Sequence, residues 1–104
     1  MIERQWHGIA KFENAEHYIA HLEKDTFPKL NGLEGYMGAK VLSKTLDSGS
    51  ISFLVITYWE SMSKIEAFTG LEINKAVVPE VAQALLISFD ETVSHYEVCT
   101  RHSP

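Results

Sequence analysis

Residues 51–59 carry large apolar side chains on both alternating faces, and this feature restricts the possible folds of the chain more than any other. The segment is rich in β-branched and aromatic residues, as strands are. Because successive strand residues point to opposite sides of a sheet, both faces of this strand are predicted to be covered. One face carries Phe53, Val55 and Trp59, and the other carries Leu54, Ile56 and Tyr58.

Helical spacing, alternation and turn residues divide the rest of the chain into further elements. Pro28 disfavours helical geometry at the preceding residue, so the first helix is predicted to end or bend near Phe27. Ser63 and Glu66 stand at capping-box spacing and predict the start of the second helix. In chain order, we predict a strand at 2–10, a helix from about Asn14, strands at 35–46 and 51–59 joined by a turn at 47–50, a helix after Trp59, a helical turn from Pro79 to Leu86, and a strand at 91–100.

This order of elements predicts an α+β fold of the ferredoxin-like type. A βαββαβ order gives a four-stranded antiparallel sheet with its helices on one face. The 104 residues suit a single domain, 1–104, and contain no linker-like segment. Since one face of the apolar strand is left without helices, we expect a symmetric homodimer that pairs two sheets.

Charge and hydropathy exclude several kinds of partner. The net charge of −5 gives a surface that repels phosphate backbones, so no nucleic acid is expected as a partner. The longest apolar runs are far too short to cross a membrane, and the N-terminal segment lacks the apolar stretch of a signal peptide. We therefore expect no membrane association and a cytoplasmic location, with which the lone cysteine, Cys99, is compatible.

Three short stretches resemble those of a known family. They are VITYWES at 55–61, AF at 67–68 and HYEV at 95–98. Together with the element order, they make nearly the whole chain similar to the antibiotic biosynthesis monooxygenase (ABM) family. The resemblance implies a dimeric α/β barrel made of a single ABM-like domain, 1–104, with a monooxygenase-like activity. The same scaffold carries enzymes and binding modules alike, so the function depends on the site.

The haem-degrading members of that family are a poor match at the aligned positions. Where they carry an Asn, a Trp and an iron-ligating His, this chain has Trp6, Phe68 and Val78. A valine cannot ligate iron, and a tryptophan lacks the compact amide that contacts the bound oxygen species. Haem degradation is therefore disfavoured.

The quinone-forming members work without a cofactor, and the resemblance implies none here. Trp59 matches their tryptophan and is a candidate catalytic residue, whereas Val55 stands where they carry an asparagine and Ile65 where they carry an aromatic residue. The resemblance thus implies a drier pocket and cofactor-independent oxygenation of a small phenolic or quinoid metabolite. The alternative is a non-catalytic module of the same fold that binds a small ligand or dimerises.

Aromatic and basic side chains are predicted to line a cleft between the sheet and the helices. Alternation places Val55 and Trp59 on the same face of their strand. The resemblance places Arg4 and Trp6 on the cleft face of the first strand and Phe68 on the second helix. Aromatic planes and one cation suit a planar phenolic or quinoid ligand. The alternative is that Trp6 and Trp59 simply fill the core.

His7 and His95 are the candidate general bases, because imidazole exchanges protons near neutral pH. Neither has a carboxylate partner that the sequence identifies, and alternation points His7 away from Trp6. Three tyrosines are weaker candidates for a proton relay: Tyr36, Tyr58 and Tyr96.

A metal site is not predicted. His17 and His21 stand at i, i+4, a spacing that can place two imidazoles on one metal. They lie away from the helical stripe of Ala15, Ile19 and Leu22, so both are predicted to lie on the solvated face.

Overall fold

The sheet is organised around its central strand, β1. The computed structural model describes all residues, 1–104, and gives the strand order β2-β3-β1-β4 with antiparallel pairing throughout. A fifth strand, β5, pairs with the same edge of β1 as β4, at residues 2–5 instead of 8–10. The strands are β1 (Ile2–Ala10), β2 (Tyr36–Thr45), β3 (Ile51–Trp59), β4 (Leu86–Phe89) and β5 (Ser94–Glu97).

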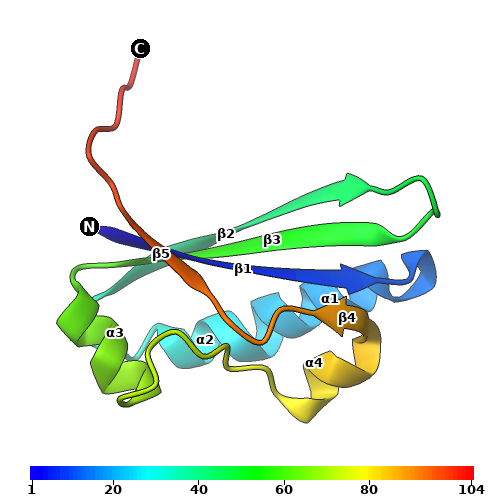
Figure 1. The fold of residues 1–104 in the computed structure, drawn as a ribbon, viewed down its shortest axis with the longest axis horizontal. Helices are drawn as coiled ribbons and strands as arrows, with labels where there is room; N and C mark the ends of the chain where they lie inside the picture. Colours follow the sequence, from blue (N-terminus) through cyan, green and yellow to red (C-terminus); the bar gives the residue numbers. More distant parts are fainter.

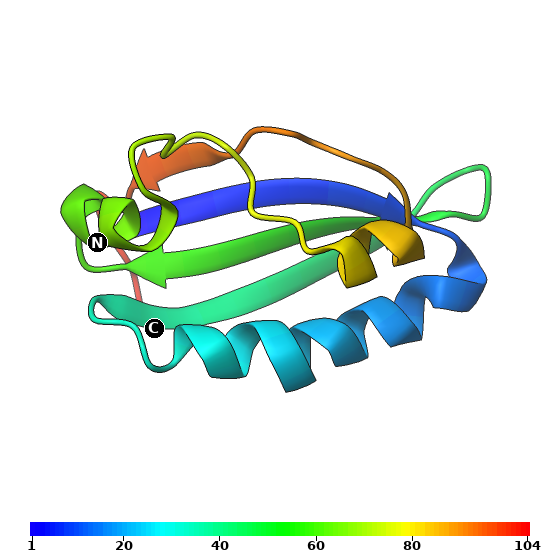
Figure 2. The ribbon, with the colours of Figure 1, turned by 90° about the horizontal axis from the view of Figure 1, so that it is seen from below.

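All helices lie on one face of the sheet, below it in Figure 1 and in front of it in Figure 2. One continuous helical run comprises η1 (Phe12–Asn14), α1 (Ala15–His21), the π-helical segment η2 (Leu22–Thr26) and α2 (Phe27–Leu30); α3 (Met62–Thr69) and α4 (Glu80–Leu85) follow. This arrangement confirms the predicted α+β, ferredoxin-like fold. None of the helices combines the length and the apolar character needed to cross a membrane.

The first helix does not end near Phe27, contrary to the prediction. It passes through Pro28 and continues to Leu30. The preceding turn widens into a π-helix, in which the backbone N–H of Phe27 bonds to the carbonyl of Leu22. A proline in a regular α-helix meets the carbonyl of residue i−4 and has no N–H to offer it. The wider turn accommodates the proline without ending the helix.

Two further boundaries differ from the sequence prediction. The cap of α3 is Ser61, whose side chain accepts a hydrogen bond from the backbone N–H of Lys64 at 3.4 Å, because Ser61 has extended backbone geometry while Ser63 is already helical. The predicted strand at 91–100 is shorter, Ser94–Glu97, and is preceded by β4, which the sequence analysis did not predict and whose first residue, Leu86, it had assigned to a helical turn. β4 exists because it pairs with β1, a contact that local pattern does not reveal.

The hairpin between β2 and β3 forms where it was predicted. The backbone N–H of Leu46 bonds to the carbonyl of Ser50 at 2.8 Å, and the N–H of Gly49 bonds to the carbonyl of Leu46 at 2.9 Å. Gly49 has a φ of 85°, which a glycine adopts without steric cost.

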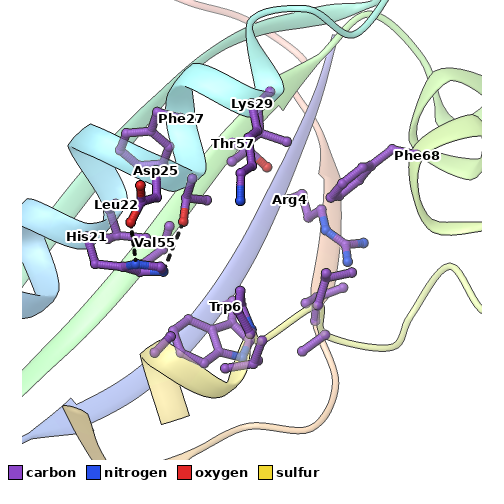
Figure 3. Close-up of a pocket in the computed structure, with 18 of the residues that line it drawn as sticks. Arg4, Trp6, His21, Leu22, Asp25, Phe27, Lys29, Val55, Thr57 and Phe68 are labelled. Carbon is purple, nitrogen blue, oxygen red and sulfur yellow. Dashed lines mark hydrogen bonds and ion pairs between the residues drawn. The ribbon is translucent and has the colours of Figure 1, made fainter. Parts of the chain in front are cut away.

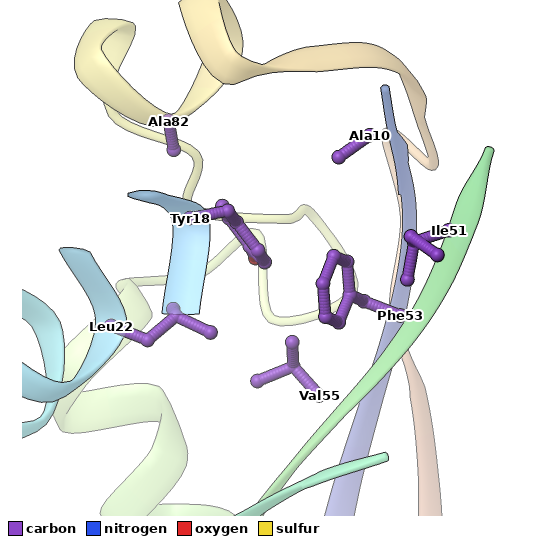
Figure 4. Packing of buried hydrophobic residues seen from close by; sticks show 7 residues of the cluster. All are labelled: Ala10, Tyr18, Leu22, Ile51, Phe53, Val55 and Ala82. Carbon is purple, nitrogen blue, oxygen red and sulfur yellow. The ribbon is translucent and has the colours of Figure 1, made fainter. Parts of the chain in front are cut away.

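The core lies between the sheet and the helices and has two parts. The larger part, shown in Figure 4, packs Tyr18 and Leu22 of the first helical run against Phe53 and Val55 of β3. The smaller part packs the Trp59 ring between helices, and its buried members are Leu30, Trp59 and Ile65.

The face of β3 that points away from the helices is only partly covered. Ile56 is 3% exposed, whereas Leu54 and Tyr58 are half-buried. The neighbouring strands contribute Leu42, 44% exposed, and Tyr96, 56% exposed. We call these five residues the open face of the sheet.

Candidate functional site

A cavity of about 410 Å³ lies between the sheet and the helices. Its floor is formed by β1 and β3, and its sides by the helical run at 18–30 and by residues 76–82 (Figure 3). Of its 21 lining residues, 14 are hydrophobic, so the cavity offers mainly apolar walls. The five predicted ligand-binding residues all line it: Arg4, Trp6, Val55, Trp59 and Phe68.

Trp59 forms a closed part of the wall. Its ring stacks on Phe68 with centroids 5.4 Å apart and meets the ring of Tyr36 edge-on at 5.5 Å. Its indole N–H donates to the Thr57 hydroxyl at 2.9 Å. The residue is 0% exposed, so a ligand would reach its ring only after a neighbour moved. In this geometry Trp59 supports the cavity wall, and its indole N–H is already bonded within the protein.

Trp6 lies half-buried on the cavity floor. Its indole N–H donates to the carbonyl of Asp90 at 2.7 Å. This hydrogen bond ties the ring to the residue that follows β4. The ring rests over Gly8, where a Cβ atom would come within 2.7 Å of the Trp6 side chain. The absence of a side chain at Gly8 therefore allows Trp6 to occupy the floor.

We expect Gly8→Ala to displace the Trp6 ring and to lower the free energy of unfolding by about 1–3 kcal/mol, the usual cost of overpacking. Urea unfolding followed by circular dichroism measures the loss, and tryptophan fluorescence reports the displaced ring. Gly32→Ala is the matched control, because the nearest atom to its new Cβ would be 4.0 Å away. Equal stability of the two variants would show that the Trp6 ring adapts without cost.

Arg4 carries a buried positive charge that no carboxylate neutralises. The residue is 7% exposed. Its guanidinium donates to the carbonyls of Ile73 and Lys75 at 2.7 and 3.0 Å and to Nε2 of His95 at 2.8 Å. Desolvation lowers the pKa of Arg4 to about 10, so the group stays protonated at neutral pH. All three partners are neutral acceptors, and the cation remains available to an anionic ligand.

His95 holds Arg4 and does not line the cavity. Desolvation, and then the charge of Arg4, lower the pKa of His95 below its usual value. The ring is therefore the neutral acceptor of the Arg4 hydrogen bond.

This lowered pKa makes the stability of the fold sensitive to acid. The unfolded chain binds the His95 proton near the ordinary value of 6.5, while the folded state resists it. The stabilisation is complete above that value and is lost as the pH falls through the lower folded pKa. We expect the free energy of unfolding to drop more steeply in the wild type than in His95→Gln as the pH falls below 6.5. His102→Gln, in the exposed C-terminal segment, should behave as the wild type.

His7 lies on the opposite face of the sheet from the cavity. It is exposed, and its Nδ1 lies 3.7 Å from a carboxylate oxygen of Asp90. Tyr58 and Tyr96 belong to the open face, and Tyr36 packs on Trp59, where desolvation raises its pKa. None of these four side chains lines the cavity.

His21 was predicted to be solvated, and this prediction is wrong. Its side chain is only 8% exposed and lies against the cavity. The buried face of α1 is centred on Tyr18, which is 2% exposed, and His21 is three residues further along the helix. Ala82 of α4 packs against the same cluster as Tyr18. His17 is exposed, as predicted, and no group of three or more His, Cys, Asp or Glu residues is arranged to hold a metal.

His21 has a polar partner on each ring nitrogen, as the dashed lines in Figure 3 show. Nδ1 lies 3.3 Å from a carboxylate oxygen of Asp25, and Nε2 lies 3.3 Å from the Thr26 hydroxyl. The contact with Asp25 is poorly aligned for a hydrogen bond, and Nδ1 is buried without one. The spacing of Tyr18, Leu22 and Asp25 is the sequence signal that could have revealed this cluster.

Tyr18 adds a hydroxyl group to the cavity lining. Burial raises its pKa, so the phenol is neutral under ordinary conditions. The cavity thus combines apolar walls with a buried cation, a histidine beside a carboxylate, and a phenolic hydroxyl.

No sequence profile of a protein family matches this chain, and no curated protein matches it. Several solved structures match this chain, and two of them cover nearly its full length. A "putative antibiotic biosynthesis monooxygenase" from Deinococcus radiodurans is 16% identical, with 100% of this chain and 98% of that chain covered and a TM-score of 0.63. A protein of the same description from Bacillus cereus is 17% identical, with 99% and 96% covered and a TM-score of 0.62. The similarity confirms the predicted fold.

Proposed function

We propose that this protein binds a small phenol or hydroquinone as its anion and oxygenates it without a cofactor. The observation that carries the proposal is Arg4, a buried cation without a carboxylate partner on the wall of an apolar cavity. An uncompensated buried charge is costly. A phenolate oxygen beside Arg4 would neutralise it.

The size and lining of the cavity suit a ligand of this class. A volume of about 410 Å³ falls within the usual range for small-molecule sites. The apolar walls would exclude water and hold an aromatic ring, while Arg4 would fix the orientation of its oxygen. An electron-rich phenolate held away from water is the form of a phenol that reacts with O₂.

The proposed reaction balances without another reactant. A phenol with a free ring position and one O₂ give a quinone and one water. The phenolic O–H bond and one aromatic C–H bond break, one oxygen atom bonds to the ring carbon, and the other leaves as water. The phenol is oxidised and O₂ is reduced. The fold shared with the two monooxygenase-like structures supports this class of chemistry.

An oxygen electrode tests the proposal with a panel of monohydric phenols, naphthols and hydroquinones. We expect protein-dependent O₂ uptake with at least one of them and a quinone product detected by absorbance. A chelator and added flavin should leave the rate unchanged. Binding of several phenols without O₂ uptake from any of them would contradict the oxygenase.

The buried state of Trp59 favours a second candidate, a non-catalytic module that binds a small ligand. Trp59 is stacked on Phe68 and bonded to Thr57, as expected for a tryptophan that fills a core. Binding measured by tryptophan fluorescence, with no turnover of any bound phenol, would support this alternative.

We also propose that the open face of the sheet pairs with the same face of a second copy. Its apolar centre is flanked on β2 by Lys40 and Lys44, and on β1 by Glu3, which pairs with Tyr58. A two-fold axis parallel to β3 would place the lysines of one copy opposite Glu3 of the other, around the apolar residues. We expect a dimer in sedimentation velocity that Leu54→Lys dissociates. Leu71→Lys, at an exposed position away from the sheet, is the control, and a monomeric wild type would contradict the pairing.

A further inference from the structure

We propose that His21, oriented by Asp25, accepts the proton of the hydroxyl group that binds in the cavity. The inference rests on the proposed function and assigns a role to a histidine that the sequence analysis had placed on the solvated face. Both His21 and Asp25, and Thr26, which follows Asp25 in the chain, line the cavity.

His21 is buried and Asp25 is exposed, as a route for a proton from the cavity to solvent requires. The His21 side chain is 8% exposed, whereas that of Asp25 is 59% exposed and reaches solvent. The imidazole therefore stands between the cavity and an acidic group in contact with water. A proton taken from the cavity has a path outward through His21.

The two ring nitrogens of His21 can play different parts. A carboxylate accepts hydrogen bonds only, so Asp25 favours the tautomer with the hydrogen on Nδ1. That tautomer leaves the lone pair of Nε2 free to accept a proton. The partner of Nε2 is the Thr26 hydroxyl at 3.3 Å, a long contact that a ligand hydroxyl can replace or use as a bridge. Catalytic hydrogen bonds are often poorly aligned before a ligand binds and become tighter in the complex. The alignment of His21 with Asp25 in the free protein is therefore compatible with this role.

The charges around the cavity fit this transfer. The titratable residues that line it are Arg4, Tyr18, His21, Asp25 and Lys29. The segment at 76–82 contributes only apolar residues to the lining, and Arg4 is the one titratable lining residue that comes from the sheet. When a neutral phenol binds and its proton moves to Nε2, the imidazolium lies beside Asp25 and the phenolate shares the cavity with the Arg4 cation. No net charge enters the cavity.

The probe for the test is 4-nitrophenol, whose anion absorbs in the visible and whose neutral form does not. The experiment uses the whole protein at a pH at which the free probe is mostly protonated. We expect the wild type to bind the probe as the anion and His21→Gln to reduce the bound anion by about tenfold, the effect of losing one favourable charged contact. His17→Gln is the matched control, one turn earlier on the same helix and exposed.

Nitrogen-15 NMR of the histidine rings gives a readout that a structural role would not move. On addition of the probe, the His21 ring of the wild type should become protonated at both nitrogens, and Asp25→Asn should weaken this change. An equal anion band in His21→Gln, or a neutral His21 ring in the complex, overturns this inference and leaves the phenol-binding function standing. Failure of the wild type to bind the probe overturns both.

Discussion

Trp59→Ala is expected to lower the free energy of unfolding by about 3–5 kcal/mol, the range for removing a large buried aromatic side chain. Trp59 is fully buried, stacks on Phe68 and meets Tyr36 edge-on. The substitution removes both aromatic contacts, leaves a cavity and deprives the Thr57 hydroxyl of its donor. Urea unfolding monitored by circular dichroism measures the change.

Leu71→Ala is the control for this experiment, because its side chain is 89% exposed and should cost little. Trp59→Phe should recover a large part of the loss, since the ring still stacks on Phe68. A cost below about 1 kcal/mol for Trp59→Ala would mean that the ring is not a central part of the core.

Arg4→Met is expected to weaken the binding of a phenolate by about 10–100-fold, the loss of one charge-assisted hydrogen bond. Methionine keeps much of the length of the side chain while removing the charge. The proposed function makes Arg4 the counter-ion of the ligand, so the substitution should weaken the binding of the anion more than that of a neutral ligand. Titration of the wild type and the variant with 4-nitrophenol, at a pH above the pKa of this probe and followed by absorbance, measures the two affinities.

Lys29→Met is the matched control for Arg4→Met, because it removes the same charge from an exposed position on the cavity rim. Arg4→Met also leaves the carbonyls of Ile73 and Lys75 without their donor, so its stability must be compared with that of the wild type. 4-Nitroanisole, which cannot ionise, separates the two effects. If the variant loses the same affinity for the anion and for the neutral probe, the cavity has collapsed and Arg4 does not recognise charge.

Local patterns predicted most of the fold. Alternation identified β3 and its two apolar faces, and the turn residues at 47–50 located the hairpin. The same rules misplaced the end of the first helix, because Pro28 is accommodated by a π-helical turn. They also missed β4, whose four residues become a strand only through pairing with β1.

The candidate site was predicted in part. The side chains of Arg4, Trp6 and Val55 reach one cavity because strand alternation and antiparallel pairing bring them to the same face. His21 was assigned to the wrong side of its helix. Its burial depends on how far the helix is rotated against the sheet, which the packing of Tyr18 and Leu22 in the core decides.

The sequence by itself determined the alternation of β3, the order of the elements and the placement of helices on one face, because these follow from side-chain spacing along short segments. Only the tertiary structure decided that Arg4 meets carbonyls about seventy residues away, at Ile73 and Lys75, and that His21 faces the cavity beside Asp25. Such contacts join segments that the chain separates. The free energy that allows a charge or an imidazole to be buried comes from the packing of the whole fold, so no short sequence pattern predicts this burial.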